Sequence, residues 1–427
     1  MSQENDTLRL ALEELDRRYN KTVGVASSNL CTHCGWCVDQ CHYYLATKDP
    51  TISPVAKAER IRSVYKRHHD WMSRIFPRWT GARELTEAEL DDWVEVAYRN
   101  CTLCDRCMAN CPLAVDTAQI LLAARGVLLA AGKAPEMLVQ LADAALAREE
   151  NLEFFKEFYL EQLKELETEV QNHLGSDKAR IPVEVEGAKI LYVPLSGAHT
   201  ITPPAIVFNA VEESWTISMF EAANYATYLG DIPKAKRITE RILKEAERLK
   251  VEEIVLPECG HAYAALRWEA PKWFGGPLPF RVRSILEVLD EYVGAGRLSL
   301  NRANNPDPVT LHDSCNLGRK GGLFEEPRRV VRAAAEDFRE MTPNRERSFC
   351  CGAGSGLVAM PEWEDMRLKA GGPKAEQVHA TRASVVIASC DNCRHQFLEL
   401  DEHYELNVQV MGLTELVVQA MAPSSSA

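Results

Sequence analysis

The sequence has no apolar run long enough to cross a membrane and no excess of basic charge. The nearest approach to a spanning segment is 117–132, where Arg125 interrupts a run shorter than the about 18 residues such a helix needs. Lys and Arg number 49 against 62 Asp and Glu, and the resulting net charge of −13 argues against nucleic acid as a partner. Residues 1–20 are acidic and amphipathic, without the basic and apolar regions of a signal peptide, so we expect a cytoplasmic protein.

Cysteine is the exception to an otherwise ordinary composition. The 427 residues are 46% hydrophobic and 26% charged, as in a soluble globular chain of two or three domains. Fourteen of them are cysteines. In a reducing compartment, clustered cysteines usually bind metal or carry out redox chemistry. They fall here into groups of eight, five and one.

The group of eight forms two copies of C-x2-C-x2-C-x3-C, the spacing that wraps a cubane [4Fe–4S] cluster. In two-cluster ferredoxins the fourth cysteine of each run ligates the other cluster. We therefore assign one cluster to Cys31, Cys34, Cys37 and Cys111, and the other to Cys101, Cys104, Cys107 and Cys41.

Zinc is the alternative for these eight cysteines. It prefers paired knuckles and four ligands in total, so two complete runs of four suit two cubanes better. In the first run His42 replaces the proline that usually follows the fourth cysteine, whereas the second run keeps Pro112. We expect His42 to affect the local turn rather than the number of ligands.

The 59 residues between the runs are too many for a compact bacterial ferredoxin. Apolar residues at helical spacing predict helices over 55–69 and 86–99. This region resembles the α-helical ferredoxin domain of succinate dehydrogenase iron subunits and of heterodisulfide reductase C-type subunits. The basic run 60–69 is either a docking face or, as we favour, a solvated helix face.

The group of five follows the pattern C-x34-C-C-G-x37-C-x2-C and consists of Cys315, Cys350, Cys351, Cys390 and Cys393. It resembles the CCG domain of heterodisulfide reductase B- and D-type subunits, shared with iron–sulfur subunits of glycolate and glycerol-3-phosphate oxidation systems. The resemblance covers nearly the whole chain, because a helical ferredoxin followed by a CCG region is the order in D-type subunits. It implies that the five cysteines hold a third [4Fe–4S] cluster, noncubane in form, at which a disulfide is cleaved.

The CCG domain normally consists of two halves, and the first half is degenerate here. VEEIVLPECGHAY (251–263) echoes SVVIASCDNCRHQF (384–397), a match that pairs Cys259 with Cys393 and places Leu256 where a cysteine is lost. One cysteine cannot assemble a cluster alone, so we expect a single cluster in this region. By resemblance, this one-cluster variant fits the K subunit of the Dsr complex and its relatives in the Hmc and Tmc complexes of sulfate reducers.

The remaining site candidates lie beside the cysteine turns. Cys259 is either a small buried residue or a group that meets the cluster or substrate. His261, His312 and His395 are candidate proton donors, although a hydrogen bond to a sulfur or a carbonyl is the commoner role. We expect Gly352 and Gly354 to let the backbone approach the cluster and offer N–H groups to its sulfides. The glycine run does not match G-x-G-x-x-G, and the chain has no Walker loop, flavin fingerprint or C-x-x-C-H haem site.

The predicted fold is a multidomain α+β protein, with an α-helical ferredoxin domain followed by an α/β CCG domain of two pseudo-repeated halves. Alternation of strands and helices from about residue 181 argues for a mostly parallel sheet with the cysteine loops at strand C-terminal ends. Strands are predicted near 189–194, 253–257, 309–312, 385–388 and 408–411, and helices over 117–131, 232–249 and 282–293. The predicted division is a helical arm (1–20), a ferredoxin domain (21–132), a helical connector (133–180), a first CCG half (181–300), a second CCG half (301–421) and a disordered tail (422–427).

The resemblance implies electron transfer through the two cubanes to the CCG cluster, and thiol/disulfide chemistry there. The implied partners are an integral membrane cytochrome b or quinone-interacting subunit, other subunits such as a multihaem cytochrome c, and a cytosolic thiol/disulfide or DsrC-type protein. The implied location is the cytoplasmic face of the inner membrane. The alternative is a non-catalytic relay between a separate glycolate or glycerol-3-phosphate dehydrogenase and the quinone pool. A zinc-filled CCG site ranks third, because five cysteines exceed the usual four ligands of zinc.

Overall fold

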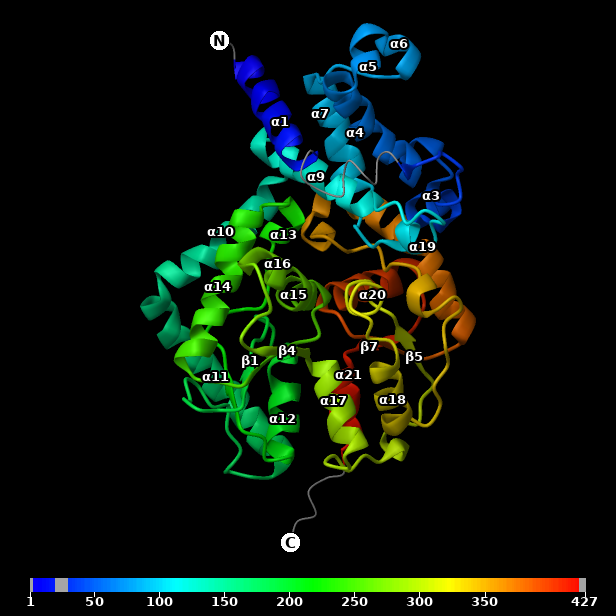
Figure 1. The fold of residues 1–427 in the computed structure, drawn as a ribbon. Helices are drawn as coiled ribbons and strands as arrows, with labels where there is room; N and C mark the ends of the chain where they lie inside the picture. Colours follow the sequence, from blue (N-terminus) through cyan, green and yellow to red (C-terminus); the bar gives the residue numbers. More distant parts are fainter. Residues whose placement is uncertain (1–2, 20–29, 422–427) are drawn as a thin grey trace. The chain divides into compact units, whose positions relative to one another are not determined.

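The computed structural model describes residues 3–19 and 30–421, which form two units (Figure 1). Unit 1 comprises Met1–Gln140, Tyr225–Asp231 and Glu346–Glu376, and unit 2 comprises Leu141–Asn224, Ile232–Arg345 and Gln377–Ala427. The predicted tail at 422–427 lies outside the described residues. The predicted division into domains stays a prediction, but two short segments from the second half of the chain fold with the ferredoxin region.

Unit 1 is helical and is built around α9 (Thr117–Ala130). Helices α1 (Gln3–Tyr19), α4 (Pro54–His69) and α7 (Glu87–Val94) all pack against α9. The remaining described helices that lie wholly in unit 1 are α3 (His42–Thr47), α5 (Trp71–Ile75), α6 (Pro77–Thr80), α8 (Arg106–Ala109) and α13 (Ala226–Leu229). Two more belong to it in part, α10 (Glu136–Glu150) as far as Gln140 and α19 (Glu364–Thr381) as far as Glu376. Ile120, Leu121 and Val127 of α9 are buried, which explains the apolar run noted in the sequence.

The two helices predicted between the cysteine runs, α4 and α7, begin where the sequence predicts, whereas the short helices α3, α5 and α6 were not predicted. Ser53 caps α4 by accepting a hydrogen bond from Ala56, with Pro54 at the first helical position, where its missing N–H costs nothing. Thr86 caps α7 in the same way. The predicted helix over 86–99 changes at its end into a single π-helical turn, Glu95–Arg99. That turn leads directly into the second cysteine run.

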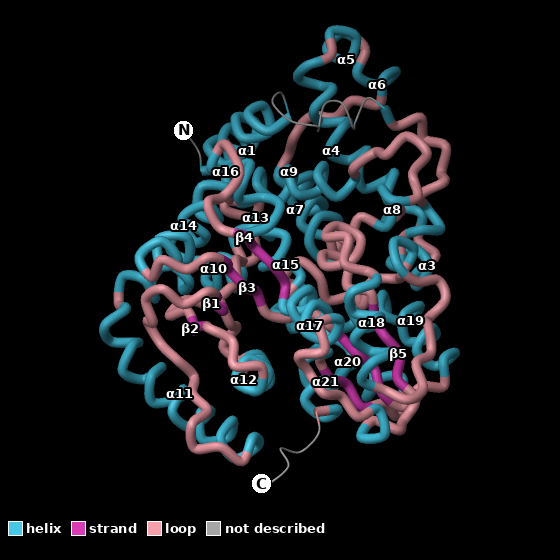
Figure 2. The backbone as a smooth tube through the Cα atoms, turned by 60° about the horizontal axis from the view of Figure 1, so that its bottom comes forward, coloured by secondary structure: helices cyan, strands magenta, loops and turns pink. Residues whose placement is uncertain are grey.

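Unit 2 contains two parallel sheets (Figure 2). The first has the order β2-β1-β3-β4 and the second has the order β5-β6-β7. Their strands are β1 (Ile190–Tyr192), β2 (Trp215–Ile217), β3 (Glu253–Leu256), β4 (Arg281–Ser284), β5 (Val309–His312), β6 (Val385–Ala388) and β7 (Gln409–Met411). The helices of this part are α11 (Leu152–Leu174), α12 (Thr202–Ala210), α14 (Ile232–Arg248), α15 (Gly260–Tyr263), α16 (Ala270–Phe274), α17 (Ile285–Gly294), α18 (Glu325–Ala334), α20 (Asp391–Tyr404) and α21 (Leu413–Ala420).

The two sheets repeat one connectivity, which confirms the predicted fold class. In the first half, β3 leads into the loop of Cys259 and pairs with β1 on one side and β4 on the other. In the second half, β6 leads into the loop of Cys390 and pairs with β5 and β7 in the same way. The last strand of each half runs into a helix whose third residue is a glutamate. Glu287 accepts a hydrogen bond from the N–H of Ser284 at 2.8 Å, and Glu415 accepts one from Gly412 at 2.7 Å. The halves therefore share detailed helix-start chemistry as well as topology.

Two elements differ from the sequence prediction. The helix predicted over 282–293 is wrong at its start, because 281–284 forms β4 and α17 begins only at Ile285. Strand β2 was not predicted. In the second half, the corresponding position is a single parallel bridge between Val309 and Phe338. No helix among residues 3–19 and 30–421 is long and apolar enough to cross a membrane.

Arg125, which interrupts the apolar run of α9, is fully buried and organises unit 1. Its guanidinium donates to the carbonyls of Ala97 at 2.9 Å and Cys101 at 2.8 Å. It also donates to Tyr228 at 3.1 Å and Ser355 at 3.2 Å. One side chain thus joins three backbone segments, at 97–101, 228 and 355, and each of the four carbonyls would otherwise be a buried acceptor that has lost its water.

We expect Arg125→Leu to lower the free energy of unfolding by about 4 kcal/mol or more, because it strands several buried carbonyls at once. Arg125→Lys should recover only part of the loss, since an ammonium lacks the planar fork. The measurement is anaerobic unfolding followed by circular dichroism. The control is Arg9→Leu, which removes a half-exposed arginine of α1 and should cost less than about 1 kcal/mol. Equal stability of Arg125→Leu and Arg9→Leu would contradict this role.

Candidate iron–sulfur sites

Two hollows in unit 1 are lined by the cysteines of the two runs. The first has a volume of about 460 Å³ and is lined by Cys31, Cys34, Cys37, Cys111 and Cys107. The second, of about 380 Å³, is lined by Cys41, Cys101, Cys104 and Cys107. In each hollow, thiols from one run meet the fourth cysteine of the other run. Such a donor set is soft and thiol-rich, which is the chemistry that suits an iron–sulfur cluster.

Buried polar atoms beside the second hollow lack protein partners, which fits a cluster there. Neither ring nitrogen of His42 has a hydrogen-bond partner among the described residues, and the same holds for the Tyr43 hydroxyl. Both side chains are almost fully buried and line this hollow. Donors left without a partner in a protein interior are costly. Cluster and cysteine sulfurs are acceptors that would satisfy them.

Buried cations also surround the second hollow. Lys57 is 2% exposed, and its ammonium lies 3.8 Å from Cys41 Sγ and 4.9 Å from the centre of the Tyr43 ring. Burial raises the pKa of Cys101, while the charges of Lys57 and Arg125 oppose that rise. These cations favour thiolate ligands and would offset the negative charge of a cluster.

The Cys-Cys-Gly loop is built onto the second cysteine run at Thr102. The Cys350 thiol lies 3.5 Å from Thr102 Oγ1, and Ser355 Oγ donates to the Thr102 carbonyl at 2.7 Å. A Cβ on Gly354 would come within 3.0 Å of that carbonyl oxygen, so only glycine fits without a shift. Gly352, at φ +106°, directs its N–H to Cys350 Sγ at 3.5 Å. Both predicted glycines therefore permit close backbone approach, Gly354 to the ferredoxin loop and Gly352 to a cysteine sulfur.

The other three cysteines of the group of five belong to unit 2, together with Cys259. Gly260 brings their loops together. Its N–H donates to Cys390 Sγ at 3.4 Å, and a Cβ at this position would lie 2.9 Å from the Cβ of Asn316, the residue after Cys315. The loops after β3, β5 and β6 thus meet at one glycine, at the carboxyl ends of parallel strands, where α/β proteins place their sites.

The cap positions correct the predicted match between the halves. Cys259 is the N-cap of α15 and Cys390 is the N-cap of α20, both in extended conformation. The structure therefore pairs Cys259 with Cys390 rather than with Cys393. Cys393 lies three residues after Cys390, and the residue three after Cys259 is Ala262. The cysteine missing from the first half is therefore replaced by Ala262. The predicted position, Leu256, instead ends strand β3.

The loop that carries Cys315 is held by a buried ion pair. The two terminal guanidinium nitrogens of Arg328 donate to the Asp313 carboxylate, at 2.7 and 2.8 Å. Arg328 is fully buried, and Glu340 completes its pairing with a 2.8 Å contact to Nε. Because a buried guanidinium needs both carboxylates to satisfy its donors, the pairing with Asp313 fixes where β5 ends and the cysteine loop begins.

Comparisons with known proteins agree with these sites. A family model described as a 4Fe-4S dicluster domain matches residues 27–115, and one described as a cysteine-rich domain, CCG, matches residues 309–398. The Hdr-like menaquinol oxidoreductase iron-sulfur subunit 2 of Archaeoglobus fulgidus is 30% identical, an alignment that covers 92% of this chain and 79% of that protein. The chain belongs to the Hdr-like iron–sulfur subunits.

Two further relatives show how far this similarity extends. The D-type polypeptide of the dihydromethanophenazine:CoB–CoM heterodisulfide reductase of Methanosarcina mazei is 25% identical, over 95% of this chain and 97% of that protein. The probable iron-sulfur-binding oxidoreductase FadF of Bacillus subtilis is 33% identical but matches only 38% of this chain. The predicted resemblance to D-type subunits is thereby confirmed. The present chain is therefore an iron–sulfur subunit of an Hdr-like oxidoreductase.

His261 of the Hdr-like subunit is buried between two hydrogen bonds. Its Nε2 accepts from the N–H of Asn224 at 3.1 Å, which leaves the proton on Nδ1, 3.3 Å from Cys259 Sγ. Burial lowers the pKa of His261 to about 4. His261 is therefore a neutral imidazole at neutral pH. This favours a role in orienting Cys259 and argues against a role as proton donor.

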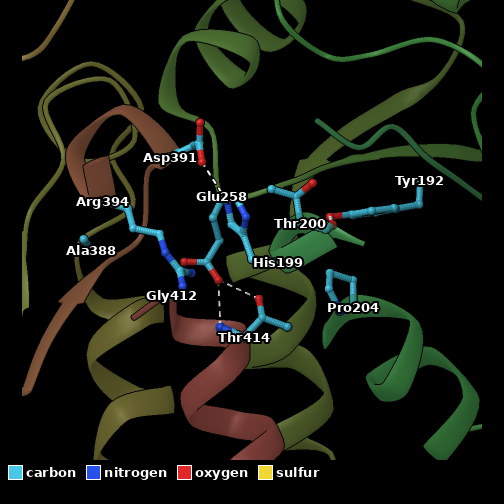
Figure 3. Close-up of a pocket in the computed structure, with 10 residues that line it drawn as sticks. All are labelled: Tyr192, His199, Thr200, Pro204, Glu258, Ala388, Asp391, Arg394, Gly412 and Thr414. Atoms are coloured by element: carbon cyan, nitrogen blue, oxygen red, sulfur yellow. Dashed lines mark hydrogen bonds and ion pairs between the residues drawn. The ribbon is translucent and has the colours of Figure 1, made fainter. Parts of the chain in front are cut away.

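A pocket of about 330 Å³ lies beside these loops in unit 2, with charged side chains in its lining (Figure 3). Glu258 enters it from the loop after β3 and accepts hydrogen bonds from Leu413 N–H at 2.8 Å and Thr414 N–H at 2.7 Å. Burial raises the pKa of Glu258 despite these bonds. Asp391 binds His199 Nε2 at 2.7 Å. Burial would raise the pKa of Asp391, but His199 and nearby positive charges lower it overall.

The sequence did not single out His199, Thr102 or Lys57. His199 follows strand β1, and its position after a parallel strand was the one available signal. Of the predicted histidines, His395 lies on the surface of α20, half exposed, with Nδ1 3.0 Å from the carbonyl of Asp391. His312 is buried at the end of β5.

We expect the low pKa of His261 to make the stability of the Hdr-like subunit pH-dependent. Because the unfolded chain protonates this imidazole near pH 6.5 and the folded chain only near pH 4, the unfolded state binds more protons in that window. Its contribution is complete above pH 6.5 and should fall by about 2 kcal/mol between pH 7 and pH 5. Urea unfolding of the wild type and of His261→Gln at both pH values measures this loss. An identical pH dependence in the two proteins would contradict it.

Proposed function

We propose that the Hdr-like subunit carries electrons through two cubane clusters to a third cluster that reduces or oxidises a thiol/disulfide. The observation that carries the proposal is the joining of the Cys-Cys-Gly loop to the second cysteine run at Thr102. A single hydroxyl links the Cys350 thiol to the backbone between Cys101 and Cys104. A path of covalent bonds and one hydrogen bond therefore runs from the second cubane site to the CCG pair.

The two cubane sites exchange their fourth ligands in this proposal. Cys111 completes the site of Cys31, Cys34 and Cys37, while Cys41 completes the site of Cys101, Cys104 and Cys107. The linings of the two hollows support it, since Cys41 lines only the second and Cys111 only the first. Cys107 borders both hollows, which would keep the two clusters close enough for rapid electron exchange.

The third site would use Cys315, Cys350, Cys351, Cys390 and Cys393. When bound, a noncubane cluster supplies an iron that takes up a sulfur and delivers electrons one at a time. The chain's own part is to offer N–H groups to the sulfurs, as Gly352 does to Cys350 and Gly260 does to Cys390. Reduction of a disulfide consumes two electrons and two protons to give two thiols, and His395, exposed beside Asp391, is the proposed proton source. Cys259, held by His261, would lie next to Cys390 as a positioning group or a contact for substrate.

The electron partner would be an integral membrane cytochrome b or a quinone-interacting subunit, with further subunits such as a multihaem cytochrome c. The names of the relatives support this side of the proposal, because one group acts on menaquinol and another on dihydromethanophenazine. The thiol/disulfide would be a small molecule or a DsrC-type protein on the cytoplasmic face. The heterodisulfide in the name of the Methanosarcina relatives supports a disulfide at the third site.

Exchange of the fourth ligands can be tested one cysteine at a time. We expect Cys41→Ser to perturb the EPR signal of the cluster held by Cys101, Cys104 and Cys107, and Cys111→Ser to perturb the other. The assignment of each signal comes from Cys104→Ser and Cys34→Ser, which lie in the middle of each run. If Cys41→Ser instead matched Cys34→Ser, each run would hold its own cluster and the exchange would be wrong.

Thiol chemistry at the third site is tested on anaerobically purified protein. We expect about twelve irons per chain, and a new EPR signal when thiol is added to the oxidised protein. Cys390→Ser should abolish that signal and leave the two cubane signals in place. About twelve irons without a thiol-induced signal would favour the non-catalytic relay between a separate dehydrogenase and the quinone pool. About eight irons would leave a two-cluster ferredoxin.

A further inference from the structure

Large apolar side chains are exposed together at one end of unit 1, on the short helices between the two cysteine runs. Trp71 is 67% exposed and Trp79 is 78% exposed. Ile75 and Phe76, between them, are 60% and 56% exposed. Single exposed apolar residues need no explanation, but four within one short segment form a patch of the kind that marks an interaction site.

The charges within this segment are all positive. Segment 71–83 (WMSRIFPRWTGAR) contains Arg74, Arg78 and Arg83 and no acidic residue. The whole chain, by contrast, carries a net charge of −13. A local positive charge on an acidic protein is therefore concentrated where the tryptophans are. Arg74 and Arg78 are both exposed.

Segment 71–83 has a defined conformation that holds its apolar side chains at the surface. Asp70 caps α5 by accepting from the N–H of Ser73 at 3.0 Å, and Ser73 faces inward, fully buried. Gly81, at φ +72°, ends α6, and the N–H of Ala82 closes the turn on the Pro77 carbonyl at 2.9 Å. Both views place α5 and α6 beyond the end of α4, at one end of unit 1 (Figures 1 and 2).

We propose that segment 71–83 is a docking surface for an anionic lipid bilayer. Tryptophan rings are the side chains most favoured at the boundary between headgroups and acyl chains, where they bury apolar area and keep the indole N–H hydrated. Ile75 and Phe76 add apolar area, and the exposed Arg74 and Arg78 pair with lipid phosphates, whereas Arg83 already pairs with Glu89 at 3.2 Å. The inference deepens the membrane side of the proposed function and rests on it for its biological setting.

A second exposed aromatic patch, on α11, differs from segment 71–83 in the charge of its neighbours. Phe154 and Phe158 of α11 are 79% and 70% exposed, an apolar area comparable to that of the tryptophans. They are interleaved with Glu153, Glu157 and Glu161, so an anionic surface would repel this part of the helix. The α11 patch therefore provides a matched control within the same chain.

The experiment is flotation of the full-length holoprotein with protein-free vesicles of phosphatidylglycerol and phosphatidylcholine. Trp71→Ala/Trp79→Ala should weaken binding by about tenfold or more. Arg74→Gln/Arg78→Gln should weaken it by about fivefold for each charge, and added salt should abolish most of that difference. Phe154→Ala/Phe158→Ala should float like the wild type.

Several results would overturn the inference. An anionic lipid surface would be rejected if the wild type failed to float or if it bound equally well to pure phosphatidylcholine. It would also be rejected if the phenylalanine variant lost as much binding as the tryptophan variant. Binding only to vesicles that carry an integral membrane protein would assign the patch to a protein partner instead. Iron content and the thiol-induced EPR signal, measured on the same samples, separate a failed docking surface from a failed redox function.

Discussion

The buried guanidinium of Arg125 is the interaction on which the arrangement of unit 1 depends. A charge taken fully out of water must be surrounded by oriented acceptors, and here the acceptors are four backbone carbonyls from three segments of the chain. Two of them, Cys101 and Ser355, belong to the second cysteine run and to the Cys-Cys-Gly loop. The same side chain that would spoil a membrane-spanning helix thus brings two metal-binding motifs, about 250 positions apart, into one unit.

Electrostatics around the second cysteine hollow follows from the same principle. Thiolates and a cluster would bring negative charge into the interior, and the chain meets it with Lys57 and Arg125 as well as with the polar hydrogens of His42 and Tyr43. The first hollow lies further toward the surface, where Cys34 is exposed. Two sites with one spacing therefore have different surroundings, which is a physical basis for different reduction potentials in one short electron path.

Much of the fold was predictable because its signals are local. Strands β5 and β6 occupy the predicted 309–312 and 385–388, since each is a short apolar run before a cysteine turn. Strand β4 was missed because RVRS carries two arginines, one of which, Arg283, is nevertheless buried against Glu253. The eight cysteines of the two runs were predicted from their spacing, and the five of the CCG group from resemblance to a known family. Thr102, Lys57 and His199 were not, because each acquires its role from a neighbour that the chain brings near only after folding.

The contact between Thr102 and Gly354 also bears on how such chains change over evolutionary time. From the polypeptide between the two motifs, unit 1 takes the residues up to Gln140 and the short segment Tyr225–Asp231, so changes of length elsewhere in that polypeptide leave the unit's own residues intact. The contact itself has less latitude, because a Cβ on Gly354 would lie 3.0 Å from the Thr102 carbonyl oxygen and one of the two would have to move aside. A larger residue at 354 would require a compensating backbone change at 102, and that change would shift a loop bearing two cysteines. The ferredoxin and CCG motifs are therefore expected to change together at this contact, although they match separate domain families.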